Sequence, residues 1–295
     1  MRPVKILTDS CSDLPRDLRE RYDIDYCKMN TSYEGKETPA SLDWEYYTPG
    51  ELYGIMRDGN RILTTQVPES EFTAKFTEYL EKGYDIVYIA CCSRQSGSVN
   101  TGAMVGQKLM EKYEGSVVYS IDSLNACMGE GMLAIRAAEY RDQGMDATQI
   151  KDKLAGDLKT VNEFVTVHSL DALKRAGRVK ASSAFFGNLL GVKPILIADK
   201  EGNQAAMKKV KGRKASMQEI VNLLKESIIE PEKQTVYVLH ADCPEEAKEL
   251  EQMVKEAIPN VKDTYIAYIG PIIGASIGPD AIGLWAFGQE VTFEG

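Results

Sequence analysis

Two spacings of hydrophobic residues alternate along the first half of the chain. Short apolar runs, such as VKILTD at residues 4–9 and DIVYIAC at residues 85–91, are typical of buried strands. Between them, as in PESEFTAKFTEYLEKG at residues 68–83, apolar residues recur every three or four positions, which indicates an amphipathic helix that ends at a glycine. Strands that alternate with helices in this way predict a parallel sheet with helices on both faces.

The remaining elements of this half follow the same pattern. Thr48 is expected to cap a helix that has Pro49 in its first turn and that ends at Gly59. The sequence predicts strands at residues 4–9, 24–33, 61–66, 85–91 and 116–122, and helices at residues 12–23, 48–59, 68–83, 98–115 and 125–144.

The second half has a mixed pattern. A helix at residues 146–162 is expected to link the halves, and the turn KEGN at residues 200–203 is expected to join two strands. Further strands are predicted at residues 163–169, 235–241, 263–270 and 281–287, and helices at residues 170–177, 181–191, 216–228 and 244–258. The predicted fold class is therefore α/β with two domains. Residues 1–150 form an open parallel sheet with helices on both faces, and residues 151–295 form a mixed sheet with helices.

Composition narrows the possible functions. The formal net charge is −9 and the pI about 5.0, which argues against nucleic acid or an anionic membrane as the main partner. No apolar run is long enough to form a transmembrane segment, and the N-terminus has no signal-peptide layout, so we expect a cytoplasmic protein. The six cysteines are expected to be free thiols, and with only His168 and His240 present we predict neither a metal site nor a cofactor.

Polar residues gather where the predicted strands end. Because ligands of open parallel sheets bind beyond the carboxyl ends of the strands, these segments are the candidate site. Hydroxyl groups and backbone N–H groups at helix starts suit a carboxylate or phosphate, although helix capping explains any single segment. Asp9, Asp13 and Asp122 would repel an anion unless they are buried in the neutral form or engaged in caps. The segments are residues 8–13, 64–66, 92–98 and 122–131.

Two classes of function remain open from the residues themselves. The chain lacks the GxGxxG, GxxxxGK[ST] and GxSxG motifs, but Ser93 as a nucleophile with His240 as its base would give an enzyme for a small anionic or acyl substrate. Alternatively, the apolar, small-residue segments 181–196 and 269–288 leave room for a ligand or allow close packing. A polar rim above an apolar slot would bind an amphiphile with an anionic head.

Eight short segments, in this order and spacing, carry a resemblance to a known family. The chain resembles the DegV family of bacterial fatty-acid-binding proteins over nearly its whole length. The resemblance implies a long-chain fatty acid such as palmitate or oleate, with the head group at the N-terminal domain and the tail in a pocket to which the C-terminal domain contributes. It also implies a carrier that presents the fatty acid to a separate fatty acid kinase and has no catalytic residue. The segments are ILTDSCSDLP, TTQVPESEF, CCSRQSGSVNTG, VYSIDSLNACMGEG, LDALKRAGRV, GNLLGVKPIL, HADCPEEA and IGPIIGASIGPDAIG.

The resemblance also assigns residues. The family's Thr-Ser-Gln segment matches residues 64–66, which places its threonine at Thr64. The family's Ser-Ser-x-x-Ser-Gly segment matches residues 92–97, which places a carboxylate ligand at Ser93 and a further hydroxyl at Ser96. Ser276 stands where the family often has a histidine near the head group, and Cys92 stands where it has the first serine. Arg178 is expected to contact the kinase or the transferred phosphate. Expected pocket side chains are Phe185, Phe186, Leu189 and Ile273.

Overall fold

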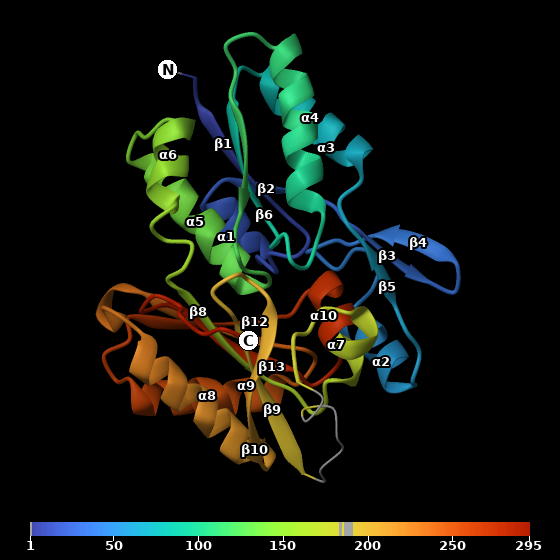
Figure 1. Ribbon diagram of the computed structural model, residues 1–295, viewed down its shortest axis with the longest axis vertical. Helices are drawn as coiled ribbons and strands as arrows, with labels where there is room; N and C mark the ends of the chain where they lie inside the picture. The colour runs from blue at the N-terminus through green and yellow to red at the C-terminus, as the bar shows by residue number, and fades with distance from the viewer. Residues whose placement is uncertain (1, 183–184, 186–190) are drawn as a thin grey trace. The chain divides into compact units, whose positions relative to one another are not determined.

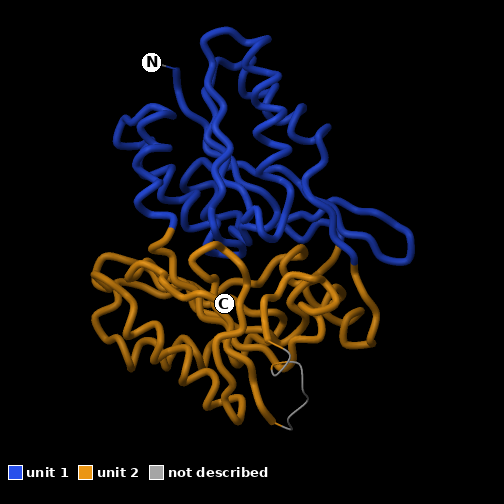
Figure 2. The backbone as a smooth tube through the Cα atoms, in the orientation of Figure 1, with its two compact units in different colours: residues 1–46, 63–158 blue, residues 47–62, 159–295 orange. Residues whose placement is uncertain are grey.

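Two units make up the chain, and each is built around its own β-sheet. The computed structural model describes residues 2–182, 185 and 191–295. Residues 1–46 and 63–158 belong to the first unit, and residues 47–62 and 159–295 belong to the second (Figure 2). Both units combine a sheet with helices, which confirms the predicted α/β class.

The first unit contains a four-stranded parallel sheet in the order β2-β1-β6-β7. Figure 1 shows α3 and α4 on one face of this sheet and α5 and α6 on the other, which confirms the predicted open parallel arrangement. The strands are β1 (Val4–Asp9), β2 (Ile24–Cys27), β6 (Asp85–Ala90) and β7 (Val118–Asp122). The helices are α1 (Arg16–Arg21), α3 (Glu69–Glu81), α4 (Ser98–Lys112), α5 (Met128–Asp142) and α6 (Ala147–Leu154).

A second, antiparallel sheet of this unit was not predicted. It has the order β4-β3-β5, with β3 (Asn30–Tyr33), β4 (Lys36–Pro39) and β5 (Leu63–Thr65). The single strand expected at residues 24–33 is broken because side chains take the backbone N–H groups at its middle. The N–H of Lys28 donates to Glu71 Oε1 (3.0 Å), and the N–H of Met29 donates to Ser10 Oγ (3.0 Å). The chain therefore leaves the first sheet there and enters the second.

The second unit contains a six-stranded sheet in the order β10-β9-β8-β13-β11-β12. The sheet is mixed, as predicted. In it, β11 and β12 pair in parallel, and the other neighbouring strands pair antiparallel. Helices α8 and α9 bury their apolar side chains against the sheet, in a core with Phe164, Ile195 and Leu284. The strands are β8 (Val161–Thr166), β9 (Val192–Ala198), β10 (Gln204–Lys211), β11 (Thr235–His240), β12 (Asp263–Tyr268) and β13 (Ile282–Phe287), and the helices are α2 (Pro49–Arg57), α7 (Asp171–Ala176), α8 (Arg213–Ser227), α9 (Pro244–Ala257) and α10 (Pro271–Ile277).

Helix α2 comes early in the chain but packs in the second unit. Thr48 caps it as predicted, in a reciprocal arrangement with Glu51. The buried hydroxyl of Tyr53 donates to the carbonyl of Ile269 (2.6 Å). Helix α10, which was not predicted, lies against α2, and Gly274 has no side chain because a Cβ there would collide with the ring of Tyr53. Part of the glycine-rich C-terminal segment thus serves close packing.

The division of the chain differs from the predicted boundary at residue 150. That position lies inside α6, whose side chains Ile150 and Leu154 are buried in the first unit. The helix predicted at residues 146–162 ends at Leu154. Val161, which was expected to be helical, begins β8 and pairs with Phe287. The helix predicted at residues 181–191 falls largely outside the described residues, as do Phe186 and Leu189.

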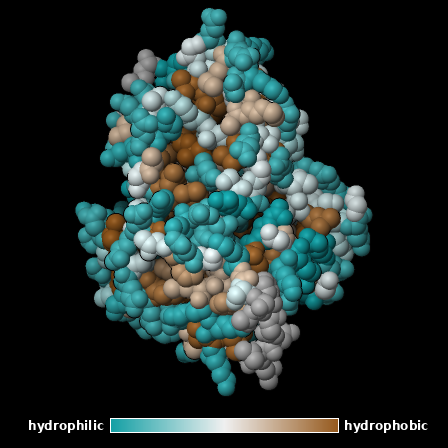
Figure 3. All heavy atoms as spheres, in the orientation of Figure 1, coloured by the Kyte–Doolittle hydropathy of each residue, from teal (hydrophilic) through white to brown (hydrophobic). Residues whose placement is uncertain are grey.

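The surface shown in Figure 3 carries mostly hydrophilic residues around smaller groups of hydrophobic ones. Within the described ranges, the large hydrophobic side chains with the greatest exposure include Leu63 at 49% and Met104 at 42%, both in the first unit. No helix in the described part of the chain is both long and apolar enough to cross a membrane.

Candidate functional site

The loop between β6 and α4 presents Ser93, which is exposed. Its backbone N–H donates to Asp122 Oδ1 (3.2 Å), at the end of the neighbouring strand β7. The same carboxylate oxygen accepts the N–H of Leu124 (3.0 Å). Asp122, one of the three acidic residues that were expected to repel an anion, is therefore engaged in holding the backbone of two loops.

Ser96 shapes the same loop. Its N–H and that of Gln95 donate to the carbonyl of Cys92 (3.0 and 2.9 Å), which closes a tight turn after β6. Its hydroxyl lies 2.9 Å from Ser98 Oγ and accepts the N–H of Ser98 (3.3 Å). Ser96 is thus tied into the loop, and its predicted contact with a ligand stays a prediction.

The end of β5 lies directly beside this loop. The N–H of Val67 donates to Ser98 Oγ (3.2 Å), and Gln66 Nε2 donates to Thr101 Oγ1 (2.9 Å). A Cβ at Gly97 would collide with Gln66 Oε1, so a larger residue there would displace the end of the Gln66 side chain. The two segments that the family resemblance assigned to the head group, residues 64–66 and 92–97, are therefore brought together within the first unit.

The polar residues after β1 are turned inward instead. Asp9 is completely buried, and its carboxylate accepts the N–H of Cys11 (2.9 Å), the hydroxyl of Tyr88 (2.6 Å) and the N–H of Cys91 (3.2 Å). Burial raises the pKa of Asp9. The expected rim of four polar strand ends is thus only partly exposed, because β1 contributes buried, hydrogen-bonded groups.

The other two predicted contact residues lie in the second unit. Ser276 is half-buried in α10, and its hydroxyl donates to the carbonyl of Ile272 (3.3 Å). Arg178 is exposed just after α7, and its guanidinium donates to the carbonyl of Ala176 (2.5 Å). Thr64, Ser93 and Ser96 therefore lie on two neighbouring segments of the first unit, and Ser276 and Arg178 belong to the second.

Both histidines also belong to the second unit. The Nδ1 atom of His240 accepts the N–H of Cys243 (3.1 Å), and the ring packs against Tyr268 in a tilted arrangement, with 4.4 Å between centroids and 52° between the ring planes. Burial lowers the pKa of His240 to about 4, so the imidazole is neutral at pH 7. Burial also lowers the pKa of His168, whose Nδ1 lies 2.9 Å from Lys193 Nζ. The first unit has no imidazole of its own that could activate Ser93.

Comparisons with known proteins agree on one family. The family model described as "Uncharacterised protein, DegV family" matches residues 3–289. A DegV domain-containing protein of Clostridium perfringens strain 13 is 34% identical over 289 residues, which cover 98% of this chain and 99% of that protein.

Solved structures match over similar lengths. The crystal structure of a DegV lipid-binding protein from Thermotoga maritima is 27% identical, with a TM-score of 0.84 and coverage of 99% of this chain and 100% of that one. A structure from Thermus thermophilus, described as showing fatty acid binding of a DegV family protein, is 27% identical, with a TM-score of 0.85 and coverage of 98% and 100%. The fold, the family model and the relatives together show that this chain belongs to the DegV family.

Proposed function

We propose that this protein binds one long-chain fatty acid, such as palmitate or oleate, and receives its carboxylate at the hydroxyl groups of Thr64 and Ser93. The observation that carries the proposal is the meeting of the β5 end with the β6–α4 loop, held by the Val67–Ser98 and Gln66–Thr101 hydrogen bonds. The binding properties named for the relatives from Thermotoga maritima and Thermus thermophilus support the same class of ligand.

The two ends of such a ligand contribute unequally to its affinity. Burying roughly 15 methylene groups contributes about 12 kcal/mol gross at ~0.8 kcal/mol each. A hydrogen bond to a charged group contributes about 1.5–3 kcal/mol. The tail therefore supplies most of the affinity, while Thr64 and Ser93 fix the orientation of the head.

The finer parts of the proposal concern the tail and the partner. The tail is buried in an apolar pocket of the protein. The loaded protein then presents its fatty acid to a separate kinase, with Arg178 contacting the kinase or the transferred phosphate. The protein itself acts as a carrier, which agrees with the absence of any histidine from the first unit, where Ser93 lies.

Titration with palmitate, followed by calorimetry, tests the head-group assignment. Ser93→Ala and Thr64→Val should each weaken binding roughly 10- to 100-fold, which corresponds to the loss of one hydrogen bond to a carboxylate. Ser116→Ala is the matched control, because its buried hydroxyl donates to the carbonyl of Tyr113 at the other end of α4. Unchanged affinity in both Ser93→Ala and Thr64→Val would contradict the assignment.

The enzyme interpretation is tested with the same variants. A carrier should leave acyl esters, such as a nitrophenyl palmitate, intact at equimolar concentration. Turnover of the ester that disappears in Ser93→Ala and persists in Ser116→Ala would replace the carrier proposal with a hydrolase.

A further inference from the structure

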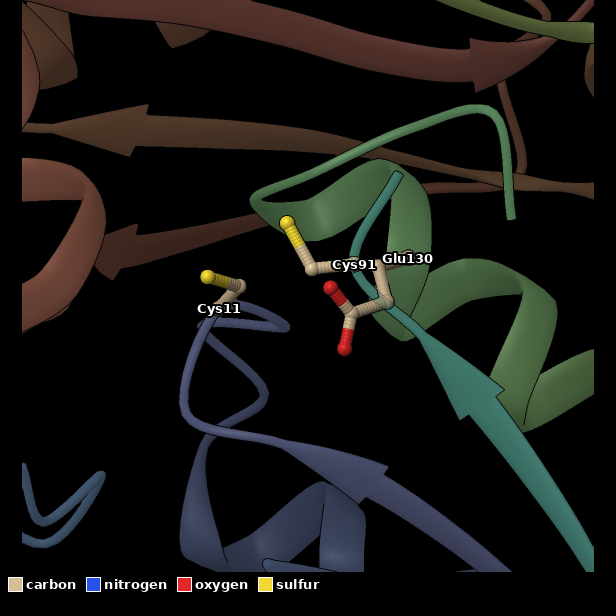
Figure 4. A group of neighbouring side chains, drawn as sticks. All are labelled: Cys11, Cys91 and Glu130. Carbon is tan, nitrogen blue, oxygen red and sulfur yellow. The ribbon is translucent and has the colours of Figure 1, made fainter. Parts of the chain in front are cut away.

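Three side chains with metal-binding chemistry meet in the interior of the first unit. Cys11, Cys91 and Glu130 each bring one sulfur or carboxylate oxygen to a common point, and these atoms all lie within 4.8 Å of one another. All three residues are buried, Glu130 completely. Figure 4 shows the two sulfur atoms and the carboxylate gathered where the three segments converge.

The fold brings these residues together from distant parts of the sequence. Strands β1 and β6 are parallel neighbours with Leu7 level with Tyr88, so Cys11 and Cys91 leave the same edge of the sheet. Helix α5 packs against β1 and carries Glu130 in its first turn. The three residues do not belong to a local motif such as CxxC, which is why we predicted no metal site from the sequence.

Glu130 has an incomplete set of partners. Its Oε1 atom accepts the hydroxyl of Thr8 (2.6 Å) and the N–H of Asp9 (3.3 Å). Its Oε2 atom is buried and has no hydrogen-bond partner among the residues that the structure describes. A buried carboxylate with an unpaired oxygen is costly, so this oxygen needs either a proton or a cation. Burial, together with the nearby carboxyl of Asp9, raises the pKa of Glu130 well above its usual value.

The two cysteines add soft donors to the same point. Their thiols hydrogen-bond each other, and Cys11 Sγ also lies 3.5 Å from the thioether sulfur of Met29. The hydrogen bond to Cys91, together with burial, raises the pKa of Cys11 well above its usual value. Zinc binds a cysteine as the thiolate, so a bound zinc ion would displace the thiol proton.

We propose that Cys11, Cys91 and Glu130 form a binding site for one zinc ion. Thiolate sulfur and carboxylate oxygen are ordinary zinc ligands, at about 2.3 and 2.0–2.2 Å from the metal, whereas Mg²⁺ and Ca²⁺ prefer oxygen donors alone. Ligands around a tetrahedral zinc are roughly 3.5–3.8 Å apart, so small side-chain movements suffice to close the site.

The charges and outer contacts of the site also fit. Two thiolates and one carboxylate carry three negative charges, so Zn²⁺ leaves a residual charge of −1 and one open coordination position. Binding releases the displaced thiol and carboxyl protons to solvent. The Thr8 hydroxyl and the Asp9 N–H continue to hold Oε1 and orient the carboxylate, while Oε2 takes the metal.

Zinc content and affinity test this site directly. The reduced, metal-free full-length protein is titrated with Zn²⁺ against a chromophoric chelator, and bound metal is measured by mass spectrometry after dialysis. We expect one zinc per chain, bound at least ~100-fold more weakly in Cys11→Ser and Cys91→Ser. Cys27→Ser and Cys243→Ser, which alter a buried cysteine of the same unit and one of the other unit, should bind as the unaltered protein does.

A spectroscopic measurement covers the case in which the ligand variants do not fold. Co²⁺ bound to the unaltered protein should show the near-ultraviolet thiolate-to-cobalt band expected for two thiolates. Absence of this band, or equal zinc binding in all four variants, would overturn the proposal and leave Glu130 as a protonated core residue. Ser93→Ala should still bind zinc. A protein that binds no zinc and a protein that binds no fatty acid are therefore two separate results.

Discussion

Ser98 joins the two segments of the proposed head-group site, and its removal is the most informative single change. The residue is completely buried, and its hydroxyl oxygen accepts the N–H of Val67 (3.2 Å) and contacts Ser96 Oγ (2.9 Å). In Ser98→Ala, the N–H of Val67, also fully buried, loses this acceptor. Leaving a buried donor unpaired costs about 1–3 kcal/mol.

We therefore expect Ser98→Ala to lower the free energy of unfolding by about 2 kcal/mol. With a urea dependence of about 2 kcal/mol per molar, the unfolding midpoint of the first unit moves down by about 1 M. Because β5 and the β6–α4 loop then keep the Gln66–Thr101 hydrogen bond but lose the Val67–Ser98 one, they are held less firmly before ligand binding, and palmitate affinity should also fall, by roughly 3- to 10-fold. Urea unfolding followed by circular dichroism and a palmitate titration measure the two effects.

Ser116→Ala separates the two effects. It removes a buried hydroxyl that donates to the carbonyl of Tyr113 (2.6 Å), so it should lower stability without changing palmitate affinity. The reasoning is refuted if Ser98→Ala unfolds within about 0.5 kcal/mol of the unaltered protein, or if both variants lose affinity equally.

Three further changes have defined outcomes. Burial raises the pKa of Glu163 from 4.5 to about 7, so the folded state holds a proton that the unfolded state has lost, and stability falls as pH rises from about 4.5 to about 7. Glu163→Gln should remove this fall in the free energy of unfolding, which is worth about 3 kcal/mol. Urea unfolding at a series of pH values measures it, and a variant whose stability still falls with pH as much as that of the unaltered protein would disprove the assignment. Tyr53→Phe removes the hydrogen bond to Ile269 (2.6 Å) and should destabilise the second unit by about 1 kcal/mol. Unfolding followed by the fluorescence of the buried Trp285 measures this loss, and an unchanged free energy of unfolding would mean that the bond contributes nothing. Arg178→Ala should slow kinase-dependent phosphorylation of bound fatty acid and leave fatty acid affinity unchanged, and equal turnover would exclude Arg178 from the partner contact.

Local patterns predicted the class of each unit and most of its elements, because buried strands and amphipathic helices each have a characteristic spacing of hydrophobic residues. The cap at Thr48 followed from a local rule and is present. The assignment of α2 to the second unit did not follow, because it depends on the long-range bond between Tyr53 and Ile269. The division of the strand at residues 24–33 likewise depends on Ser10 and Glu71, which lie elsewhere in the sequence.

The candidate site shows the same limit. Family resemblance indicated Thr64 and Ser93, and the structure brings their segments together. The sequence placed Ser98 in the polar segment 92–98 but did not indicate that its hydroxyl joins this segment to the end of β5, since one serine at a helix start looks like any cap. The Cys11–Cys91–Glu130 group was also invisible, because its members are neighbours only after β1, β6 and α5 have packed.

Native mass spectrometry of the purified protein tests fatty acid binding most directly. We predict one adduct per chain with the mass of a long-chain fatty acid, which organic extraction releases and identifies as palmitate, oleate or a similar acid, and which is reduced in Ser93→Ala but not in Ser116→Ala. Protein that is free of ligand as purified, and that takes up neither palmitate nor oleate when they are added, would contradict the proposed function.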